Sequence, residues 1–567
     1  MTSFKKISEE MPWLQHYSEH VPNKVDIPKN TVQELFDHTA EEYANKIALI
    51  FYGKKISFRE LKIDVDKFTN ALQSIGLKRG DRLALYLFNS PQFIIAYLGA
   101  LKAGVTVVPV SPVYTSVELK YQLDDSKTTS IICQDVLYEN VLNTELDLDN
   151  IIVTGVGDYL PTIKRALGKT ILRGFFSDME IPSTSIIKQS GSYMFMNLLK
   201  EHEPFPEEVE VKPEDIATLP YTGGTTGMSK GVQISHYNLI AAETIISSFL
   251  YNLEEGNEVA VAFLPFYHIY GQVSIMLNSL LRGFTQLLFT NPDVDEILDT
   301  SESCKATIFY GVPTIFEVLN EHKKTERVDW ERFKLILCAA DTLQDKIVQD
   351  WENKTGTGVV EGYGLTETTA GVLVNPVNKP KAGSLGIPIP NVNVDVIDPD
   401  TLEFLPIGET GELIVKGPNV MQGYWERDKE TEETIINVNG GKWLRTGDIV
   451  KCDQEGYFYF IDRTKDLIKY KGYSVFAREI EDALCAHPQV KSAGVFGVPD
   501  DKAGQLIKAI VVLNPESRGR VSEEDITNYC KERLAHYKIP KFIEFRGELP
   551  RTDVGKVSRR ELREEEE

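Results

Sequence analysis

The stretch RLALYLFNSPQFIIAYLGALKAGVTVVPV, residues 82–110, decides the fold class of this 567-residue chain. Arg82–Leu87 is an apolar run typical of a buried strand, Pro91–Ala103 predicts a helix, and Val105–Val110 predicts a second buried strand. Two parallel strands need a crossover between them, and that crossover is usually a helix. The order strand, helix, strand therefore predicts an α/β protein with a parallel sheet.

A second region of the chain repeats this pattern. Between residues 255 and 320 we expect strands at Val259–Leu264, Thr285–Leu288 and Thr307–Tyr310, with a helix at Tyr270–Leu281. A chain of this length holds several domains or subdomains. Two such regions predict two α/β subdomains.

The C-terminal part of the chain has a different pattern. Residues 384–460 hold short strands between Gly and Pro turns, which predicts a β-subdomain. A compact α+β unit follows, with helices expected at Arg478–Ala486 and Glu523–Ala535. We therefore predict an α/β protein with a large N-terminal domain, residues 1–462, that contains two α/β subdomains and the β-subdomain. Residues 463–567 form a small α+β C-terminal domain.

The charge of the chain limits its partners. Its 84 Asp and Glu outnumber its 61 Lys and Arg, so the formal net charge is −23. Because a phosphate backbone requires a basic face, this balance argues against nucleic acid as the main partner. Residues 463–567 differ, since 20 Lys and Arg there stand against 19 Asp and Glu. That unit is net positive without Glu564–Glu567, which suggests that it meets an anion.

Composition also bears on location. None of the six cysteines is in CxxC spacing, which favours a reducing compartment over disulfides or zinc. The first twenty residues are polar and acidic and lack the apolar core of a signal peptide. The longest apolar run, Phe93–Leu101, is far shorter than the roughly 20 residues of a membrane span. We expect a soluble cytoplasmic protein, and homo-oligomers remain compatible with the sequence.

One basic stretch departs from the acidic body. Residues 160–176, LPTIKRALGKTILRGFF, are amphipathic as well as basic. The simpler interpretation is a surface excursion that packs on the body. The alternative is a peripheral contact with a membrane surface.

The loop YTGGTTGMSKG, residues 221–231, carries the strongest chemical signal. Its glycines allow the backbone to turn tightly and to expose N–H groups to an anion. The threonine hydroxyls add donors, and Lys230 adds a full positive charge. The loop is not a Walker A motif, because Gly231 stands where that motif needs Ser or Thr. A P-loop NTPase is therefore disfavoured.

The loop closely resembles the phosphate loop of the acyl-adenylate-forming superfamily, which includes acyl-CoA synthetases, adenylation domains of peptide synthetases and firefly-type luciferases. Ser229 departs from the usual proline before the lysine. Further segments resemble the family's other motifs, in the family's order: Leu101–Pro109, Pro265–Gly271, Tyr363–Glu367, Thr446–Asp448, Asp462–Gly472 and Pro550–Lys556. The resemblance covers nearly the whole chain.

The resemblance implies an acyl-CoA synthetase-like fold and a set of residues for ATP. Asp448 and Arg463 are expected to hold the ribose, and Tyr363 to lie against the adenine. The β- and γ-phosphates would meet the glycine-threonine loop and Lys230. The full nucleotide- and CoA-binding set is Thr222, Gly223, Gly224, Thr225, Thr226, Gly227, Lys230, Ala339, Ala340, Asp341, Glu361, Gly362, Tyr363, Gly364, Asp448, Arg463, Lys465, Lys471 and Gly472.

The resemblance also implies a catalytic set, formed by Lys556, Thr366, Glu367, His268 and Lys469. Lys556 would bridge the carboxylate and the α-phosphate, because attack of one anion on another needs charge neutralisation. Glu367 and Thr226 would hold Mg²⁺. The C-terminal domain would be mobile, rotating at Lys465 between half-reactions and bringing Lys469–Gly472 and CoA to the acyl-adenylate.

The expected reaction is acid, ATP and CoA to acyl-CoA, AMP and pyrophosphate, on medium- or long-chain fatty acids. Relatives that use acetate carry a tryptophan at the position of Gly364, so glycine there is interpreted as leaving the acid pocket open. Alternatives are a ligase for a short, hydroxylated or aromatic acid, a luciferase-like oxygenase, and an enzyme that loads a carrier protein. A non-catalytic nucleotide-binding protein is disfavoured by the intact Lys230, Glu367 and Lys556.

Overall fold

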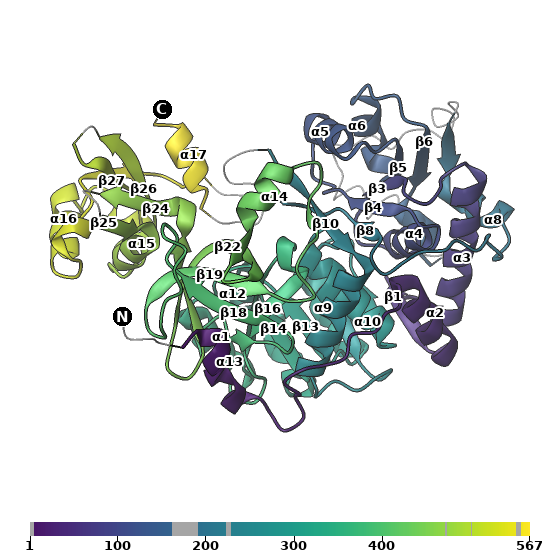
Figure 1. Ribbon diagram of the computed structural model, residues 1–567, viewed down its shortest axis with the longest axis horizontal. Coiled ribbons are helices and arrows are strands. Elements are labelled where there is room, and N and C mark those ends of the chain that lie inside the picture. Colours follow the sequence, from purple (N-terminus) through teal and green to yellow (C-terminus); the bar gives the residue numbers. More distant parts are fainter. Residues whose placement is uncertain are drawn as a thin grey trace.

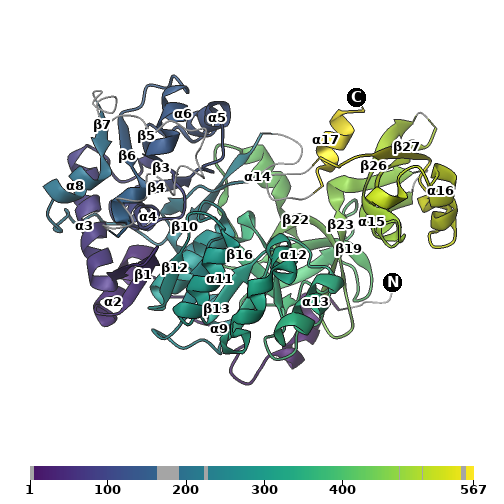
Figure 2. The same ribbon diagram turned by 180° about the vertical axis from the view of Figure 1, so that it is seen from behind.

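The computed structural model describes residues 5–161, 191–222, 228–470, 473–500, 502–550 and 557–566. These residues form four β-sheets, which follow one another along the long axis of the molecule (Figure 1). The view from behind shows the same order, with the chain's first α/β region at one end and its C-terminal unit at the other (Figure 2). The expected mixed α/β architecture is confirmed.

The sheet built around the opening stretch has the order β20–β10–β8–β4–β3–β5–β6–β7, with β9 beside β10. Strands β3 and β4 are parallel, with Leu83 opposite Val107, as the sequence predicts. Helix α4 (Pro91–Lys102) connects them. The strands are β3 (Arg82–Tyr86), β4 (Thr106–Pro109), β5 (Ser130–Gln134), β6 (Asn150–Thr154), β7 (Ser192–Met194), β8 (Ile216–Thr218), β9 (Tyr221–Thr222), β10 (Lys230–Ser235) and β20 (Gly423–Tyr424).

The other large sheet has the order β17–β16–β15–β14–β13–β11–β12–β1–β2, and its central pairs are parallel. The parallel strands β11 to β15 place their carboxyl ends at one edge, where ligands bind in open α/β sheets. The strands are β1 (Ile47–Phe51), β2 (Lys54–Ser57), β11 (Val259–Ala262), β12 (Thr285–Leu288), β13 (Ile308–Gly311), β14 (Leu335–Cys338), β15 (Val360–Leu365), β16 (Ala370–Val374) and β17 (Ile387–Pro388).

Helices cover both large sheets. Helix α3 (Phe58–Ser74) begins at a capping box, in which Ser57 accepts from the Glu60 N–H while the Glu60 carboxylate accepts from the Ser57 N–H. Other long helices are α2 (Val32–Glu42), α5 (Ser116–Ser126), α9 (His236–Phe249), α11 (Val294–Ser303), α12 (Pro313–Glu321) and α13 (Asp345–Thr355).

The helix expected over Tyr270–Leu281 differs from an ordinary α-helix. Its first part, η5 (Tyr270–Leu277), is a π-helix, and α10 (Asn278–Leu281) continues it. Gly271 packs so closely on the Pro265 carbonyl that a Cβ there would stand 2.1 Å from the oxygen. A π-helical turn widens the helix at this crowded position, and such turns are frequent at functional sites.

The two smaller sheets belong to the C-terminal part of the chain. The predicted β-subdomain has the order β18–β19–β22–β21 with β23 beside β22, and the C-terminal sheet has the order β25–β24–β27–β26 with β28 beside β27. Their strands are β18 (Asn393–Ile397), β19 (Thr410–Lys416), β21 (Ile435–Val438), β22 (Gly441–Cys452), β23 (Phe458–Arg463), β24 (Leu467–Tyr470), β25 (Tyr473–Phe476), β26 (Val490–Asp500), β27 (Gly504–Leu513) and β28 (Phe542–Arg546).

Three helices accompany the C-terminal sheet: α15 (Ala477–Cys485), α16 (Glu523–Lys531) and α17 (Arg559–Glu564). The expectation of one helix over Glu523–Ala535 is wrong at its end, because α16 stops at Lys531. This unit has an apolar core of its own, made of residues between Ile468 and Ile543, apart from the core of the body. No helix among the described residues is both long and apolar enough to cross a membrane.

Candidate active site

Tyr363, Asp448 and Arg463 form a cluster around a buried carboxylate where two sheets meet. Asp448 lies opposite Arg463 in the antiparallel pair β22–β23, and Arg463 Nε is 3.1 Å from Asp448 Oδ1. The Tyr363 hydroxyl, from β15, donates to Asp448 Oδ2 at 2.7 Å. The Asp448 side chain is almost fully buried. Three sequence-predicted residues, separated by up to 100 positions, are thus in direct contact.

The charges in this cluster reinforce one another. Burial and the neighbouring Asp448 carboxylate raise the pKa of Tyr363 well above its usual value, so its hydroxyl remains a donor at neutral pH. Asp448 also raises the pKa of Arg463, against the effect of burial. A carboxylate held by one hydroxyl and one guanidinium keeps further lone pairs for other donors. It can therefore accept from the hydroxyls of a sugar.

Glu367 lies just past β15 in the short helix η8 (Thr366–Thr368). Its Oε1 accepts from the Tyr424 hydroxyl at 2.8 Å, and its backbone oxygen accepts from the Met421 N–H. Burial, followed by the Glu367 charge, raises the pKa of Tyr424. Sequence analysis missed Tyr424, because the two-residue strand β20 that carries it is recognisable only from its pairing with β10.

Lys230 and Thr222 lie at the two ends of the glycine-threonine loop. They are direct partners in the antiparallel pair β9–β10, so the loop between them starts and ends at one place. Lys230 Nζ stands 4.3 Å from the centre of the Tyr424 ring, whose hydroxyl reaches Glu367. One tyrosine therefore connects the loop's lysine to the candidate magnesium ligand.

Several predicted residues lie outside the described part of the chain. They are Gly223, Gly224, Thr225, Thr226 and Gly227 of the loop, Lys471 and Gly472 after the hinge, and the catalytic candidate Lys556. Most of the basic stretch 160–176 also lies outside it. Among the residues that are described, no group of three or more His, Cys, Asp or Glu is gathered as a metal site.

Ala339–Asp341 follow β14 directly, at the carboxyl edge of the sheet. Ala340 has a φ of 74°, a left-handed conformation that is uncommon for alanine and is often found at functional sites. Next to this segment, Cys338 pairs with Glu361 of β15. Burial raises the pKa of Glu361 to about 7, although backbone N–H groups of Gly383 and Leu343 oppose the shift.

The structure gives a reason for glycine at position 364 that differs from the predicted one. A Cβ at this position would lie 1.6 Å from the Ala370 carbonyl oxygen and 3.0 Å from the Gly371 Cα, both in β16. The glycine therefore allows a close approach of two backbones at a register shift in β15–β16. The interpretation of Gly364 as a residue that opens the acid pocket is not supported. At Gly362 a Cβ would make only ordinary contacts, at 3.8 Å or more.

The segment expected to line the acid pocket is partly exposed and partly buried. His268 is exposed and its Nδ1 accepts from the Tyr270 N–H at 3.3 Å, whereas Tyr270 is buried and stands edge-on to Tyr310. Ile246 of α9 approaches Gly371 of β16. Here α9, η5 and β16 pack against one another through largely apolar residues.

Lys469 and Lys465 lie beyond the nucleotide cluster. Lys469 Nζ pairs with Asp400 Oδ2 at 3.0 Å on the molecular surface, so the structure does not bring it to Glu367 or Asp448. Lys465 is half-buried, and burial together with repulsion by Arg463 lowers its pKa to about 8.

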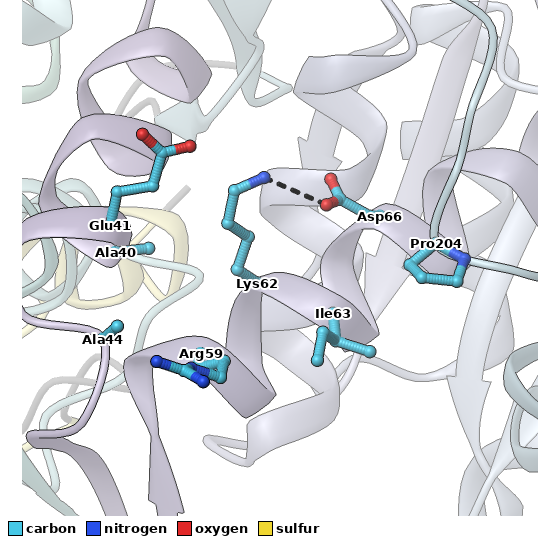
Figure 3. Close-up of a pocket in the computed structure, with 8 residues that line it drawn as sticks. All are labelled: Ala40, Glu41, Ala44, Arg59, Lys62, Ile63, Asp66 and Pro204. Atoms are coloured by element: carbon cyan, nitrogen blue, oxygen red, sulfur yellow. Dashed lines mark hydrogen bonds and ion pairs between the residues drawn. The ribbon is translucent and has the colours of Figure 1, made fainter.

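A separate cavity opens elsewhere, between α2 and α3. It has a volume of about 390 Å³ and is lined by Ala40, Glu41, Ala44, Arg59, Lys62, Ile63, Asp66 and Pro204 (Figure 3). Lys62 and Asp66 form an ion pair at 3.0 Å in its wall. None of the predicted site residues lines it, so it is not the candidate active site.

Comparison with known proteins gives matches over most of the chain. The model of the AMP-binding enzyme family matches residues 36–425, and that of the AMP-binding enzyme C-terminal domain matches residues 479–556. A long-chain-fatty-acid–CoA ligase of Bacillus subtilis (strain 168) is 37% identical over 99% of both chains. The crystal structure of ATP-bound MatB from Rhodopseudomonas palustris matches with a TM-score of 0.81 and 27% identity over 94% of this chain and 99% of that one. Apo MatB matches with a TM-score of 0.72 at the same identity, over the same shares of the two chains.

Proposed function

The chain belongs to the AMP-binding enzyme family, and we propose that it is an AMP-forming acyl-CoA synthetase that acts on long-chain fatty acids. The observation that carries the proposal is the full-length similarity to a long-chain-fatty-acid–CoA ligase, together with the contacts among Tyr363, Asp448 and Arg463. The reaction joins the acid to AMP, releases pyrophosphate and then transfers the acyl group to the CoA thiol.

The nucleotide residues take their roles from this geometry. Asp448 accepts from the ribose hydroxyls while Arg463 and Tyr363 hold its carboxylate in place. Ala339–Asp341 and Glu361 form the edge of the adenine site, and Lys230 with the loop that begins at Thr222 binds the phosphates. The proposal draws support from the position of Ala339–Asp341 directly after β14, at the carboxyl edge of the sheet.

Glu367 fits a magnesium site. Its Oε1 is oriented by the Tyr424 hydroxyl, and carboxylate oxygens suit this hard cation. Mg²⁺ bound there together with Thr226 would supply positive charge for the pyrophosphate leaving group. Tyr424 itself fixes the direction of the carboxylate.

Lys556 and the second half-reaction complete the proposal. Lys556 would neutralise charge between the carboxylate and the α-phosphate, with Thr366 as a further donor and His268 at the acid. The domain division at 462/463 and a hinge at Lys465 would allow Lys469–Gly472 to replace Lys556. The better fit to ATP-bound than to apo MatB supports assignment of the present arrangement to the first half-reaction.

An acid panel tests the proposed function. Pyrophosphate release is measured with saturated acids from acetate to stearate, 3-hydroxy acids and a hydroxycinnamate. We expect the highest kcat/KM for long chains, because the residues packed around Tyr270 and Ile246 are largely apolar. A best substrate among acetate or the aromatic acids would overturn the chain-length assignment. Absence of acid-dependent pyrophosphate release would overturn the enzymatic one.

The thiol acceptor and the wider partners need separate measurements. Acyl transfer is compared between CoA and an acyl carrier protein, with oxygen uptake as the sign of luciferase-like chemistry. We propose a cytoplasmic enzyme, which fits the six free cysteines among the described residues. Peripheral membrane contact through residues 160–176 predicts co-flotation with anionic vesicles, and light scattering decides whether homo-oligomers form.

A further inference from the structure

Asp462 is a buried carboxylate on which contacts from both sides of the expected hinge converge. It lies in β23, one residue before Arg463, and its side chain is fully buried. Oδ1 accepts from the Arg463 N–H at 2.8 Å and from Arg559 Nη1 at 2.9 Å. Oδ2 accepts from the Arg478 N–H, in the first turn of α15, at 2.9 Å. Asp462, which precedes Lys465, thus binds residues of α15 and α17, which both follow Lys465.

Arg559 is the second centre of this arrangement. Besides Asp462, its guanidinium contacts Asp466 at 3.0 Å and Glu481 at 2.8 Å. Burial disfavours its charged form, but these three carboxylates outweigh that effect and raise its pKa. Arg563, one turn later in α17, also donates to Asp466. The guanidinium fork suits such multiple carboxylate contacts better than a lysine does.

Arg478 adds contacts with the body of the protein. Its Nη1 is 3.3 Å from the hydroxyl of Thr342, which follows the adenine-edge segment directly. Its guanidinium also lies 5.5 Å from the centre of the Phe460 ring in β23. The α15 end nearest to Asp462 is therefore held against the nucleotide side of the molecule.

We propose that Asp462 and Arg559 form a clamp that holds the C-terminal unit in the orientation for acyl-adenylate formation. Both are positioning residues, and the inference rests on the proposed function. Arg559 follows Lys556 by three residues, which span at most about 11 Å of extended chain. An anchored Arg559 therefore restricts the reach of Lys556.

The clamp is specific to one orientation. Rotation at Lys465 carries α15 and α17 together, so the contacts of Arg559 with Glu481 and Asp466 travel with the unit. The contacts of Asp462 with Arg478 and Arg559 must break. Because Arg559 keeps two carboxylate partners after release, the clamp opens without leaving a buried unpaired guanidinium.

Rates of the two half-reactions test the clamp. Asp462→Asn keeps the shape of the side chain and removes its charge, and Arg559→Lys keeps a charge and removes the fork. Both should slow acyl-AMP formation at least tenfold and leave thioester formation from supplied acyl-AMP within twofold. Equal loss of both steps, or loss of neither, would overturn the proposal.

Two control variants remove ion pairs that should not affect acyl-AMP formation. Glu479→Gln breaks the ion pair between Glu479 of α15 and Lys538, which lies wholly within the C-terminal unit. Asp299→Asn breaks an exposed pair with Lys324 that lies wholly within the body of the protein, and exposed pairs contribute little. Both controls should keep acyl-AMP formation within twofold, and a tenfold loss in either would contradict a specific clamp.

Hydrogen exchange provides a readout without turnover. In the full chain, Asp462→Asn and Arg559→Lys should raise exchange of the Arg478 amide and of residues 341–343, while the centre of β26–β27 keeps its protection. Unchanged exchange at Arg478 would overturn the clamp even if activity falls. A wild-type chain that forms no adenylate from any acid would refute the proposed function, and exchange would still decide the clamp.

Discussion

Asp462 and Arg463 are neighbours in one strand but belong to two different charged clusters. Arg463 pairs with Asp448 and, through it, with Tyr363, all from the region before the hinge. Asp462 pairs with Arg559 from the last helix of the chain. Because successive side chains of a strand point to opposite faces, one residue of offset is enough to separate the two clusters.

The two clusters differ in which parts of the chain contribute their residues. The nucleotide cluster involves β15, β22 and β23 only, so a domain rotation leaves it intact. The clamp involves groups on both sides of Lys465, so the same rotation breaks it. Substitutions in the nucleotide cluster should therefore affect both half-reactions, and substitutions in the clamp should affect adenylate formation alone.

Lys556→Ala should have the largest effect, and this effect should be confined to acyl-AMP formation, the half-reaction that depends on the orientation of the C-terminal unit. Loss of a full charge aimed at the developing transition state should slow acyl-AMP formation by at least about a hundredfold. Thioester formation from supplied acyl-AMP should stay within a few-fold, as measured by rapid quench. Lys491→Ala, an exposed lysine of the same unit, is the control. Equal loss of both steps would rule out two working orientations.

Asp448→Asn should have the next largest effect, and it should not distinguish the half-reactions. The isosteric amide removes the charge that Arg463 neutralises and weakens the acceptor for the ribose. A lost charge-assisted hydrogen bond of about 1.5–3 kcal/mol corresponds to a rise of roughly ten- to a hundredfold in the KM for ATP. Affinity for acyl-AMP in the second half-reaction should fall similarly. Tyr363→Phe, which removes one hydroxyl, should have a smaller effect on both.

Tyr424→Phe should reduce kcat/KM for ATP by about fivefold, through a loss of about 1 kcal/mol from the hydrogen bond to Glu367. Because the tyrosine orients the candidate magnesium ligand, half-maximal activity should require more Mg²⁺. Titration of the metal at fixed ATP measures this. Tyr459→Phe removes the comparable bond to Asp453 outside the site and should leave the Mg²⁺ requirement unchanged.

The periodicity of residues 82–110 was sufficient to predict β3, α4 and β4 and their parallel pairing, because buried α/β elements leave clear apolar runs. Motif resemblance was sufficient to select Tyr363, Asp448 and Arg463, which the fold then brings into contact. Tyr424 and Arg559 carried no local signal, and Asp462 was marked only as the first residue of the hinge motif. Their importance comes mainly from contacts with residues that lie from dozens to fewer than two hundred positions away.

Gly364 and the helix at Tyr270 show why other expectations changed. Absence of a side chain at Gly364 was interpreted as space for a substrate, but the neighbouring strand β16 occupies that direction. The π-helical start of η5 depends on the approach of Gly271 to Pro265. Neither close backbone approach is visible in a hydropathy pattern, because both depend on tertiary packing.

Glu361 supplies the smallest predicted effect, and it concerns stability. Burial raises its pKa from an ordinary 4.5 to about 7, so the folded state binds this proton more tightly than the unfolded state does. Stability is therefore lost as pH rises from about 4.5 to about 7, by up to about 3 kcal/mol, and the loss is constant above that range. Glu361→Gln removes this titration, so its Tm should match that of the wild type at pH 5 and exceed it by a few degrees at pH 8. Scanning calorimetry at both pH values measures the gap, with Glu352→Gln at an exposed position of α13 as control. A gap independent of pH would show that Glu361 is not the titrating group. Glu361 would then be a buried carboxylate without the proton, and also without an arginine partner of the kind that Arg559 provides for Asp462.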